Sequence, residues 1–252
     1  MNIITTPDLN SYVELNIDLF HSKRYANIQK LKLNSILKRK NPYLFKAKHV
    51  LTAAELVKSI VDAHLSSGEE TLFGEFLEGL AIFICHHVLG GMKSSANGID
   101  LEFSKGNARY IVSIKSGPNW GNSRQVSKMK DDFNKAIRIL RSNNSSANII
   151  AVNGCCYGKD DNPDKGSYFK YCGQRFWEFI SDDNSLYTKI IEPLGYKARE
   201  KNEQFSFEYN RILNLFTAQF ISDFCNCGAI DWQKLVMFNS SASVPKSITS
   251  KP

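Results

Sequence analysis

The chain has few cysteines and no long apolar run. These two shortages argue against a cysteine-rich zinc-binding protein and against a membrane-spanning protein. Its six cysteines form no C-x-x-C pair and match no known zinc framework. Free thiols are the default in a reducing compartment, although a zinc site built from Cys155, Cys156 and Cys172 stays open. No run of about 18 apolar residues is present, so we expect no transmembrane helix and no membrane partner. The start, MNIITTPDLN, lacks the parts of a signal peptide, which predicts a cytoplasmic protein.

Acidic residues are missing from a long segment near the start. Between His21 and Ala54 there are nine lysines and arginines and no aspartate or glutamate. The whole chain carries a net charge of +7, which favours an anionic partner, with nucleic acid first. Lys38, Arg39 and Lys40 are candidate phosphate contacts in this segment. The alternative is a solvated helical face that binds nothing.

The length of 252 residues suits one large domain or one domain with an extension. Apolar residues at helical spacing over residues 8–40 predict one or two helices, with Asp8 as a cap. We predict a basic helical region over residues 1–50 and a main domain over 51–238. The serine-rich end, residues 239–252, is predicted to be disordered.

The most informative stretch is residues 98–122. Residues 99–103 alternate apolar and charged side chains, which is typical of a half-buried strand. A polar turn follows, and residues 109–115 predict a return strand. If these strands form a hairpin, Asp100 and Lys115 bring a carboxylate and an ammonium to one edge of the sheet.

A carboxylate and a lysine so placed suit phosphodiester chemistry. Carboxylate oxygens bind Mg²⁺, which polarises a phosphate and activates water. A nearby lysine stabilises developing negative charge or orients the attacking water. The alternative is that charged residues alternating along a strand simply face solvent.

The pattern G-I-D-x-E-F, followed by Y-I-V-S-I-K-S-G, resembles the active-site hairpin of the PD-(D/E)xK nuclease superfamily. That pattern has an aspartate on one strand and an acidic-x-Lys tripeptide on the next. Asp100 and Lys115 match it, whereas Ser113 stands where glutamate or aspartate is usual. This departure leaves the second metal ligand open.

A larger part of the chain, roughly residues 50–195, is similar to a small group of type II restriction endonucleases. That group cuts GGNCC-like sites and also carries Ser-x-Lys. The matching segments, in order, are residues 56–65, 73–78, 113–117, Trp120, 134–136 and 171–179. The resemblance implies an α/β restriction-endonuclease-like core, with a small mixed sheet flanked by helices. It also implies a Mg²⁺ cofactor, double-stranded DNA as partner and a homodimer that matches a palindromic site.

The same resemblance assigns roles to individual residues. Asp100 coordinates the metal, and Lys115 stabilises charge or orients water. Ser113 is a weak ligand or a water-positioning group. Glu78, on the helix before the hairpin, is an acidic partner that reaches the metal; the alternative is a surface glutamate.

The polar loop after the hairpin predicts further DNA contacts. Asn119, Asn122, Arg124 and Gln125 carry groups that bind phosphates or base edges, and the sequence does not separate the two. We predict further strands at 148–156 and 168–172. Helices are predicted at 53–65, 72–89, 126–143, 173–180, 184–192, 203–224 and 231–238.

Two alternatives to a site-specific nuclease stay open. One is a DNA-binding protein that kept the nuclease fold and lost catalysis, for which Ser113 is the motive. The other is an RNA or repair nuclease on the same fold, which exposed aromatic platforms would favour. The GGNCC-like site rests on the resemblance alone, and the cleavage position is not determined.

Overall fold

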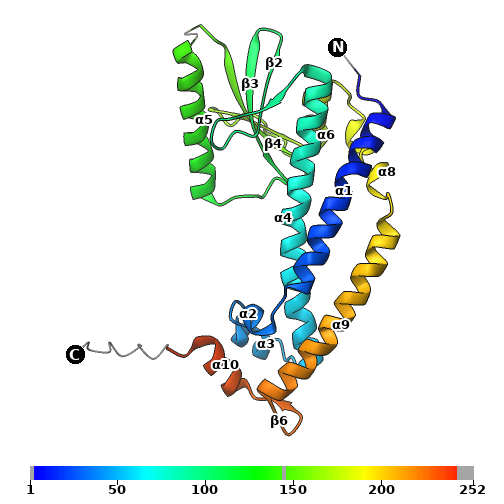
Figure 1. The fold of residues 1–252 in the computed structure, drawn as a ribbon. Helices are drawn as coiled ribbons and strands as arrows, with labels where there is room; N and C mark the ends of the chain where they lie inside the picture. Colours follow the sequence, from blue (N-terminus) through cyan, green and yellow to red (C-terminus); the bar gives the residue numbers. More distant parts are fainter. Residues whose placement is uncertain (1–2, 144–145, 243–252) are drawn as a thin grey trace, which may run out of the picture. The chain divides into compact units, whose positions relative to one another are not determined.

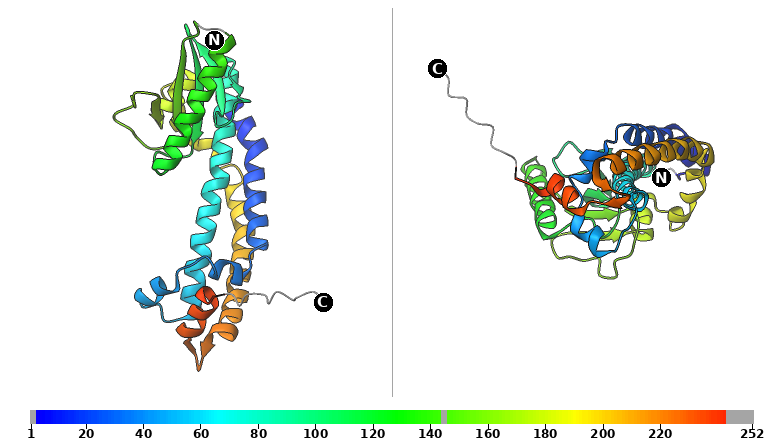
Figure 2. Two further views of the ribbon diagram at one scale, coloured as in Figure 1. Left: turned by 90° about the vertical axis from the view of Figure 1, so that its left-hand side faces the viewer. Right: turned by 90° about the horizontal axis from the view of Figure 1, so that it is seen from below.

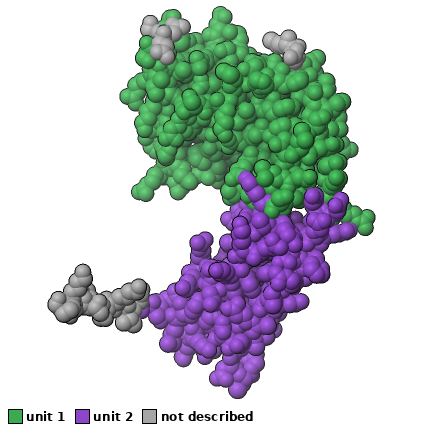
Figure 3. Space-filling model, in the orientation of Figure 1, with its two compact units in different colours: residues 1–22, 70–199 green, residues 23–69, 200–252 purple. Residues whose placement is uncertain are grey.

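A computed structural model describes residues 3–143 and 146–242 of the chain (Figure 1). Its contacts divide the chain into two compact units (Figure 3). Unit 1 comprises residues 1–22 and 70–199, and unit 2 comprises residues 23–69 and 200–252. Each unit therefore contains two segments that are distant in the sequence. The predicted functional boundaries at residues 50 and 238 stay a prediction.

Unit 1 is built around a five-stranded mixed sheet of order β1-β2-β3-β4-β5. The strands are β1 (Met92–Lys93), β2 (Leu101–Lys105), β3 (Ala108–Lys115), β4 (Ile149–Cys155) and β5 (Phe169–Cys172). β1, β2 and β3 pair antiparallel, and β3, β4 and β5 pair parallel. The predicted hairpin and both predicted later strands are confirmed.

Helices cover both faces of this sheet (Figure 1). Val112, Ile114 and Val152 share a buried cluster with Leu80 and Ile84 of α4 (Ala53–Leu89). On the other face, side chains of β3 and β4 share a cluster with α5 (Ser123–Asn143). The side chains of β3 thus point alternately into two hydrophobic cores, one on each face of the sheet. This arrangement confirms the predicted α/β class.

The described residues form further helices in both units. They are α1 (Thr6–Gln29), α2 (Leu33–Leu37), α3 (Pro42–Ala47), α6 (Gln174–Ser181), α7 (Leu186–Lys189), α8 (Ile191–Leu194), α9 (Ala198–Phe224) and α10 (Trp232–Ser240). Two short strands, β6 (Cys225–Asn226) and β7 (Ala229–Ile230), form a separate hairpin in unit 2. The core of unit 2 gathers apolar residues of α2, of residues 53–65, of α9 and of α10.

The predicted break between two helices at residues 66–68 is wrong, because α4 runs without interruption (Figure 2). Its predicted start is confirmed, since the Thr52 hydroxyl accepts a hydrogen bond from Glu55 N at 3.2 Å. Gly68 costs about 1 kcal/mol of helix propensity relative to alanine. Buried apolar residues on both sides of it outweigh that cost, because most helix stability comes from packing.

Three smaller predictions need correction. The N-cap of α1 is Thr5 rather than Asp8. Asp8 is the third residue of the helix, and its carboxylate accepts a hydrogen bond from Thr5 N at 2.9 Å. The two residues together form a capping box. The helix predicted over 184–192 is two short helices, α7 and α8, and Pro193 lies inside the second. Residues 239 and 240 of the predicted tail still belong to α10, and residues 243–252 lie outside the described residues.

α4 is long and apolar enough to cross a membrane by length and composition. The core helix of a soluble protein passes the same test, and Leu56, Ile60, Leu80 and Ile84 of α4 are fully buried. The helix is therefore weak evidence for a membrane span.

Candidate active site

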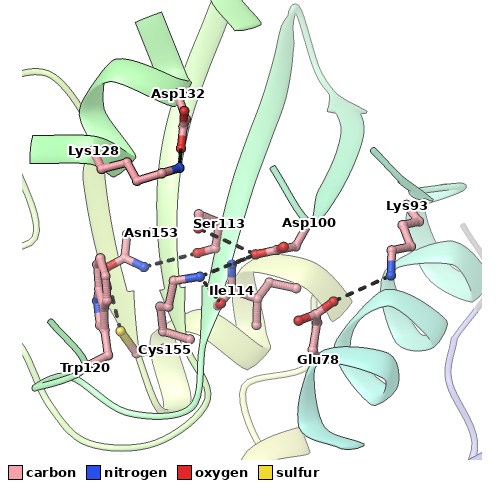
Figure 4. A network of polar contacts seen from close by, with 11 residues as sticks. Glu78, Lys93, Asp100, Ser113, Ile114, Trp120, Lys128, Asp132, Asn153 and Cys155 are labelled. Atoms are coloured by element: carbon pink, nitrogen blue, oxygen red, sulfur yellow. Dashed lines mark hydrogen bonds and ion pairs between the residues drawn. The ribbon is translucent and has the colours of Figure 1, made fainter. Parts of the chain in front are cut away.

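Asp100 lies directly before β2 and is held by the neighbouring strand (Figure 4). Its Oδ2 accepts a hydrogen bond from Ile114 N at 2.6 Å, and the Ser113 hydroxyl lies 3.5 Å from the same oxygen. Asp100 N donates to the carbonyl of Val112 at 2.8 Å. The hairpin register therefore fixes this carboxylate on β3 before any ligand binds.

Lys115 ends β3 and lies beside the same carboxylate. Its Nζ is 3.7 Å from Asp100 Oδ2 and donates to the Ile114 carbonyl at 2.8 Å. The Lys115 and Asp100 side chains are 30% and 22% exposed, so solvent reaches both charges. Such a half-exposed pair adds little to stability, but it presents both charges at one edge of the sheet.

Glu78 reaches the same edge from α4. Burial raises the pKa of Glu78, and the nearby charge of Asp100 raises it further. Lys93 and Lys115 act in the opposite direction, and Lys93 Nζ lies 3.8 Å from Glu78 Oε1. The structure thus brings Glu78, Asp100 and Lys115 together, as Figure 4 shows.

Ser113 is almost fully buried, with 2% of its surface exposed. A hydroxyl 3.5 Å from its acceptor is at the limit of hydrogen bonding. The carbonyl of Ser113 accepts a bond from Asn153 Nδ2 at 3.1 Å. We missed Asn153 in the sequence, although a polar residue inside the apolar run of β4 is a usable signal.

The donors at this edge fit Mg²⁺. Among residues 3–143 and 146–242, no group of three or more His, Cys, Asp or Glu side chains is arranged to hold a metal. Mg²⁺ commonly needs only one or two carboxylates, because waters and substrate phosphates complete its shell. Burial and, second to it, the charge of Asp100 raise the pKa of Glu78, and a divalent cation bound by these carboxylates would stabilise their charged forms.

A comparison with protein families identifies the chain. The model described as "Type II restriction endonuclease EcoO109I" matches residues 7–202. The chain belongs to this family. No curated protein matches the chain. The resemblance to type II restriction endonucleases is thereby confirmed, and the family implies a nuclease whose partner is DNA.

The loop after the hairpin builds the start of α5 in this endonuclease. Asn122 Oδ1 accepts from Gln125 N at 3.0 Å, and Gln125 Oε1 accepts from Asn122 N at 2.9 Å. This reciprocal cap uses the two side-chain oxygens and leaves the amide NH₂ groups out of the cap. Asn119 is exposed in the loop, whereas Arg124 is exposed in the first turn of α5.

Lys38, Arg39 and Lys40 belong to unit 2, whereas the residues above belong to unit 1. Lys38 and Arg39 are exposed just after α2. Burial lowers the pKa of His64, and the charges of Lys40 and Arg39 lower it further. Arg39 and Lys40 therefore lie near His64 within unit 2.

A cleft of about 560 Å³ opens beyond the ends of β4 and β5. Tyr157, Lys159, Arg175 and Tyr187 contribute to its lining. It adjoins the end of β3, because Tyr157 N donates to the Ser116 carbonyl at 3.1 Å. Ligands of sheets with parallel strands bind beyond the strand ends, so the endonuclease has a second polar surface next to Lys115.

The three central cysteines are free thiols buried in unit 1. Burial raises the pKa of Cys156 to about 12, and burial also raises the pKa of Cys155 and Cys172. Zinc binds the thiolate form. In the metal-free protein, burial therefore favours the protonated form of all three thiols.

Proposed function

We propose that this restriction endonuclease hydrolyses phosphodiester bonds in double-stranded DNA with Mg²⁺ and breaks both strands at a short palindromic or pseudo-palindromic site. The observation that carries the proposal is the placement of Lys115 Nζ 3.7 Å from Asp100 Oδ2. The nearby Glu78 carboxylate supports it. A cytoplasmic location fits a protein that meets invading DNA.

Each residue of the cluster has one role in this proposal. Asp100 and Glu78 hold the metal, which polarises the phosphate and activates water when bound. Lys115 stabilises the negative charge that develops as water oxygen adds to phosphorus and a P–O ester bond breaks. Ser113 keeps a supporting role, because its hydroxyl is near the limit of bonding to Asp100.

The DNA contacts follow from the exposed polar groups. Asn119 and Arg124, with the amide groups of Asn122 and Gln125, contact DNA beside the active site. Lys38, Arg39 and Lys40 contact phosphates from the basic region, residues 1–50, and residues 51–238 carry catalysis. A GGNCC-like site and a homodimer, one subunit per strand, complete the proposal.

The test is cleavage of unmethylated phage DNA with Mg²⁺ and with EDTA. We expect discrete bands that require Mg²⁺, and their sizes give the site. Asp100→Ala and Lys115→Ala abolish cleavage and leave DNA binding intact. Lys105→Ala is the matched control, since Lys105 lies near the turn of the same hairpin and pairs with Asp182 at 2.5 Å. Cutting by either active-site variant at the wild-type rate contradicts the assignment, and a smear indicates a non-specific nuclease.

A catalytically impaired DNA-binding protein is the second candidate. The observation that favours it is the buried serine at position 113, where the superfamily pattern has an acid. The cleavage assay, together with a gel shift, separates the two candidates. DNA binding by gel shift without Mg²⁺-dependent cutting supports the impaired protein, and discrete bands exclude it.

A further inference from the structure

Trp120 lies against the ammonium of Lys115. The Lys115 Nζ is 5.4 Å from the centroid of the Trp120 ring, within the range of a cation–π contact. Trp120 comes from the loop between β3 and α5, five residues after the lysine. A loop residue holds such a position only if something fixes its ring.

Asn153 supplies that fixation from inside β4. Trp120 Nε1 donates to Asn153 Oδ1 at 3.1 Å, and Asn153 Nδ2 donates to the Ser113 carbonyl at 3.1 Å (Figure 4). Asn153 is 1% exposed, so both halves of its amide need these partners. Since Ser113 and Asn153 are register partners in the paired strands, the indole is tied to the strand that carries Lys115.

The charged groups at this edge of the sheet indicate what the contact between Trp120 and Lys115 does. Residue 113 has a hydroxyl instead of a carboxylate, and Asp100 is the ion-pair partner of Lys115 within 4 Å among the described residues. Glu78 and Lys93 also face this edge, with opposite charges. An indole face attracts an ammonium through its quadrupole. It therefore holds Lys115 without using the carboxylate oxygens that a metal needs.

We infer that Trp120 is a positioning residue for Lys115 and that Asn153 anchors it. The inference rests on the proposed function, because it assigns Lys115 to the reacting phosphate. Trp120 acts on the lysine and contacts no reacting atom. Its removal lowers the rate of the chemical step and leaves DNA affinity nearly unchanged.

The first test is a structural readout that needs no activity. In the metal-free protein, the indole ring current shifts the NMR signals of the Lys115 ε-methylene group. We expect Trp120→Leu to abolish this shift. Asn153→Leu keeps the ring but reduces the shift, and it exposes the Trp120 indole N–H to fast hydrogen exchange. An unchanged Lys115 shift in Trp120→Leu overturns the inference.

The second test measures kcat and KM for DNA cleavage with Mg²⁺, at substrate concentrations above and below KM. We expect Trp120→Leu to lower kcat about 10- to 100-fold with KM within about twofold, because small displacements of a catalytic group cost up to about 100-fold. Trp120→Phe keeps an aromatic face but loses the hydrogen bond to Asn153, so we expect its rate to fall between those of wild type and Trp120→Leu. A rise in KM with unchanged kcat assigns Trp120 to DNA binding instead.

The matched control is Tyr168→Leu. Tyr168 lies under Lys130 Nζ at 5.8 Å in the same unit, so this variant removes a second cation–π contact away from Lys115. We expect wild-type cleavage from it, and an equal loss there makes the Trp120 effect a general loss of packing. If the wild-type protein does not cut DNA, the proposed function fails, while the ring-current shift still decides whether Trp120 holds Lys115.

Discussion

At the scale of single residues, two donors from β3 meet the Asp100 carboxylate at different lengths. The Ile114 N–H bonds at 2.6 Å, and the Ser113 hydroxyl lies at 3.5 Å. Hydrogen bonds weaken steeply with distance, so the backbone donor does most of the positioning. A backbone donor is independent of residue type, so this bond to Asp100 does not depend on which side chain stands at position 113.

Ser113→Ala is therefore predicted to retain cleavage. We expect a rate no more than about tenfold below wild type, because the variant removes one weak hydrogen bond worth about 1 kcal/mol. The measurement is the single-turnover rate with Mg²⁺, with Asp100→Ala as the inactive reference. A loss of about a thousandfold would make the Ser113 hydroxyl a direct ligand or water-positioning group.

At the scale of elements, α4 crosses Gly68 without a break although the sequence Ser66-Ser67-Gly68 favours one. No atom lies within 4 Å of where a Cβ at Gly68 would be, so a methyl group fits there. By contrast, a Cβ at Gly79 would lie 2.6 Å from the Tyr12 hydroxyl. Gly68 and Gly79, two of the three glycines of α4, therefore differ in the space available for a side chain.

We predict that Gly68→Ala stabilises the protein by about 0.5–1 kcal/mol, because alanine lowers the backbone entropy of the unfolded chain. Thermal unfolding followed by circular dichroism measures the change, with an expected rise in Tm of about 1–4 °C. Gly79→Ala is the matched control and is expected to lower Tm. A lower Tm for Gly68→Ala would show that helix continuity at this position needs glycine.

The cleft beyond β4 and β5 belongs to the same scale, since a loop and the start of α6 build it. Its exposed Lys159 and Arg175 lie close to the end of β3, where we place the cleaved phosphate. We expect these two side chains to contact the DNA backbone. Lys159→Ala and Arg175→Ala should each reduce the slope of log K against log salt by about one unit.

Gel shifts over a range of salt concentrations measure that slope. Arg141→Ala is the control. Arg141 is exposed near the end of α5, which precedes the start of β4, whereas the cleft lies beyond the end of β4. An unchanged slope for both cleft variants would exclude phosphate contacts there. Equal effects of all three variants would indicate a diffuse charge effect.

At the scale of the whole molecule, the chain has a net charge of +7, and we propose one active site in each chain. One such site breaks one strand, and a palindromic duplex offers two equivalent strands to two subunits. The basic segment from residue 21 to residue 54 supplies charge for a long anionic partner.

We predict that a heterodimer of wild-type and Asp100→Ala subunits nicks a one-site supercoiled plasmid and does not linearise it. Each subunit carries a different tag, and tandem purification isolates the mixed dimer. Wild-type homodimers should linearise the plasmid under the same conditions. Linear product from the mixed dimer, or a monomer by sedimentation with DNA, contradicts one active site per strand.

Local sequence patterns were sufficient to predict the features that depend on near neighbours in the chain. Period-two alternation predicted the hairpin that joins Asp100 and Lys115, and Thr52 with Glu55 predicted the start of α4. An apolar run predicted the central strand β4, and apolar residues at helical spacing predicted the helices α5 and α9. These signals are local because the side-chain direction and the cap are set within a few residues.

Contacts between residues that are distant in the sequence could be read from the three-dimensional structure alone. It carried α4 through Gly68, because buried residues on both sides outweigh one glycine. It placed Glu78 beside Asp100 and tied Trp120 through Asn153 to the strand of Lys115. It also divided residues 1–69 between two units. Such contacts join residues tens of positions apart, and their energy depends on packing and burial that no local pattern records.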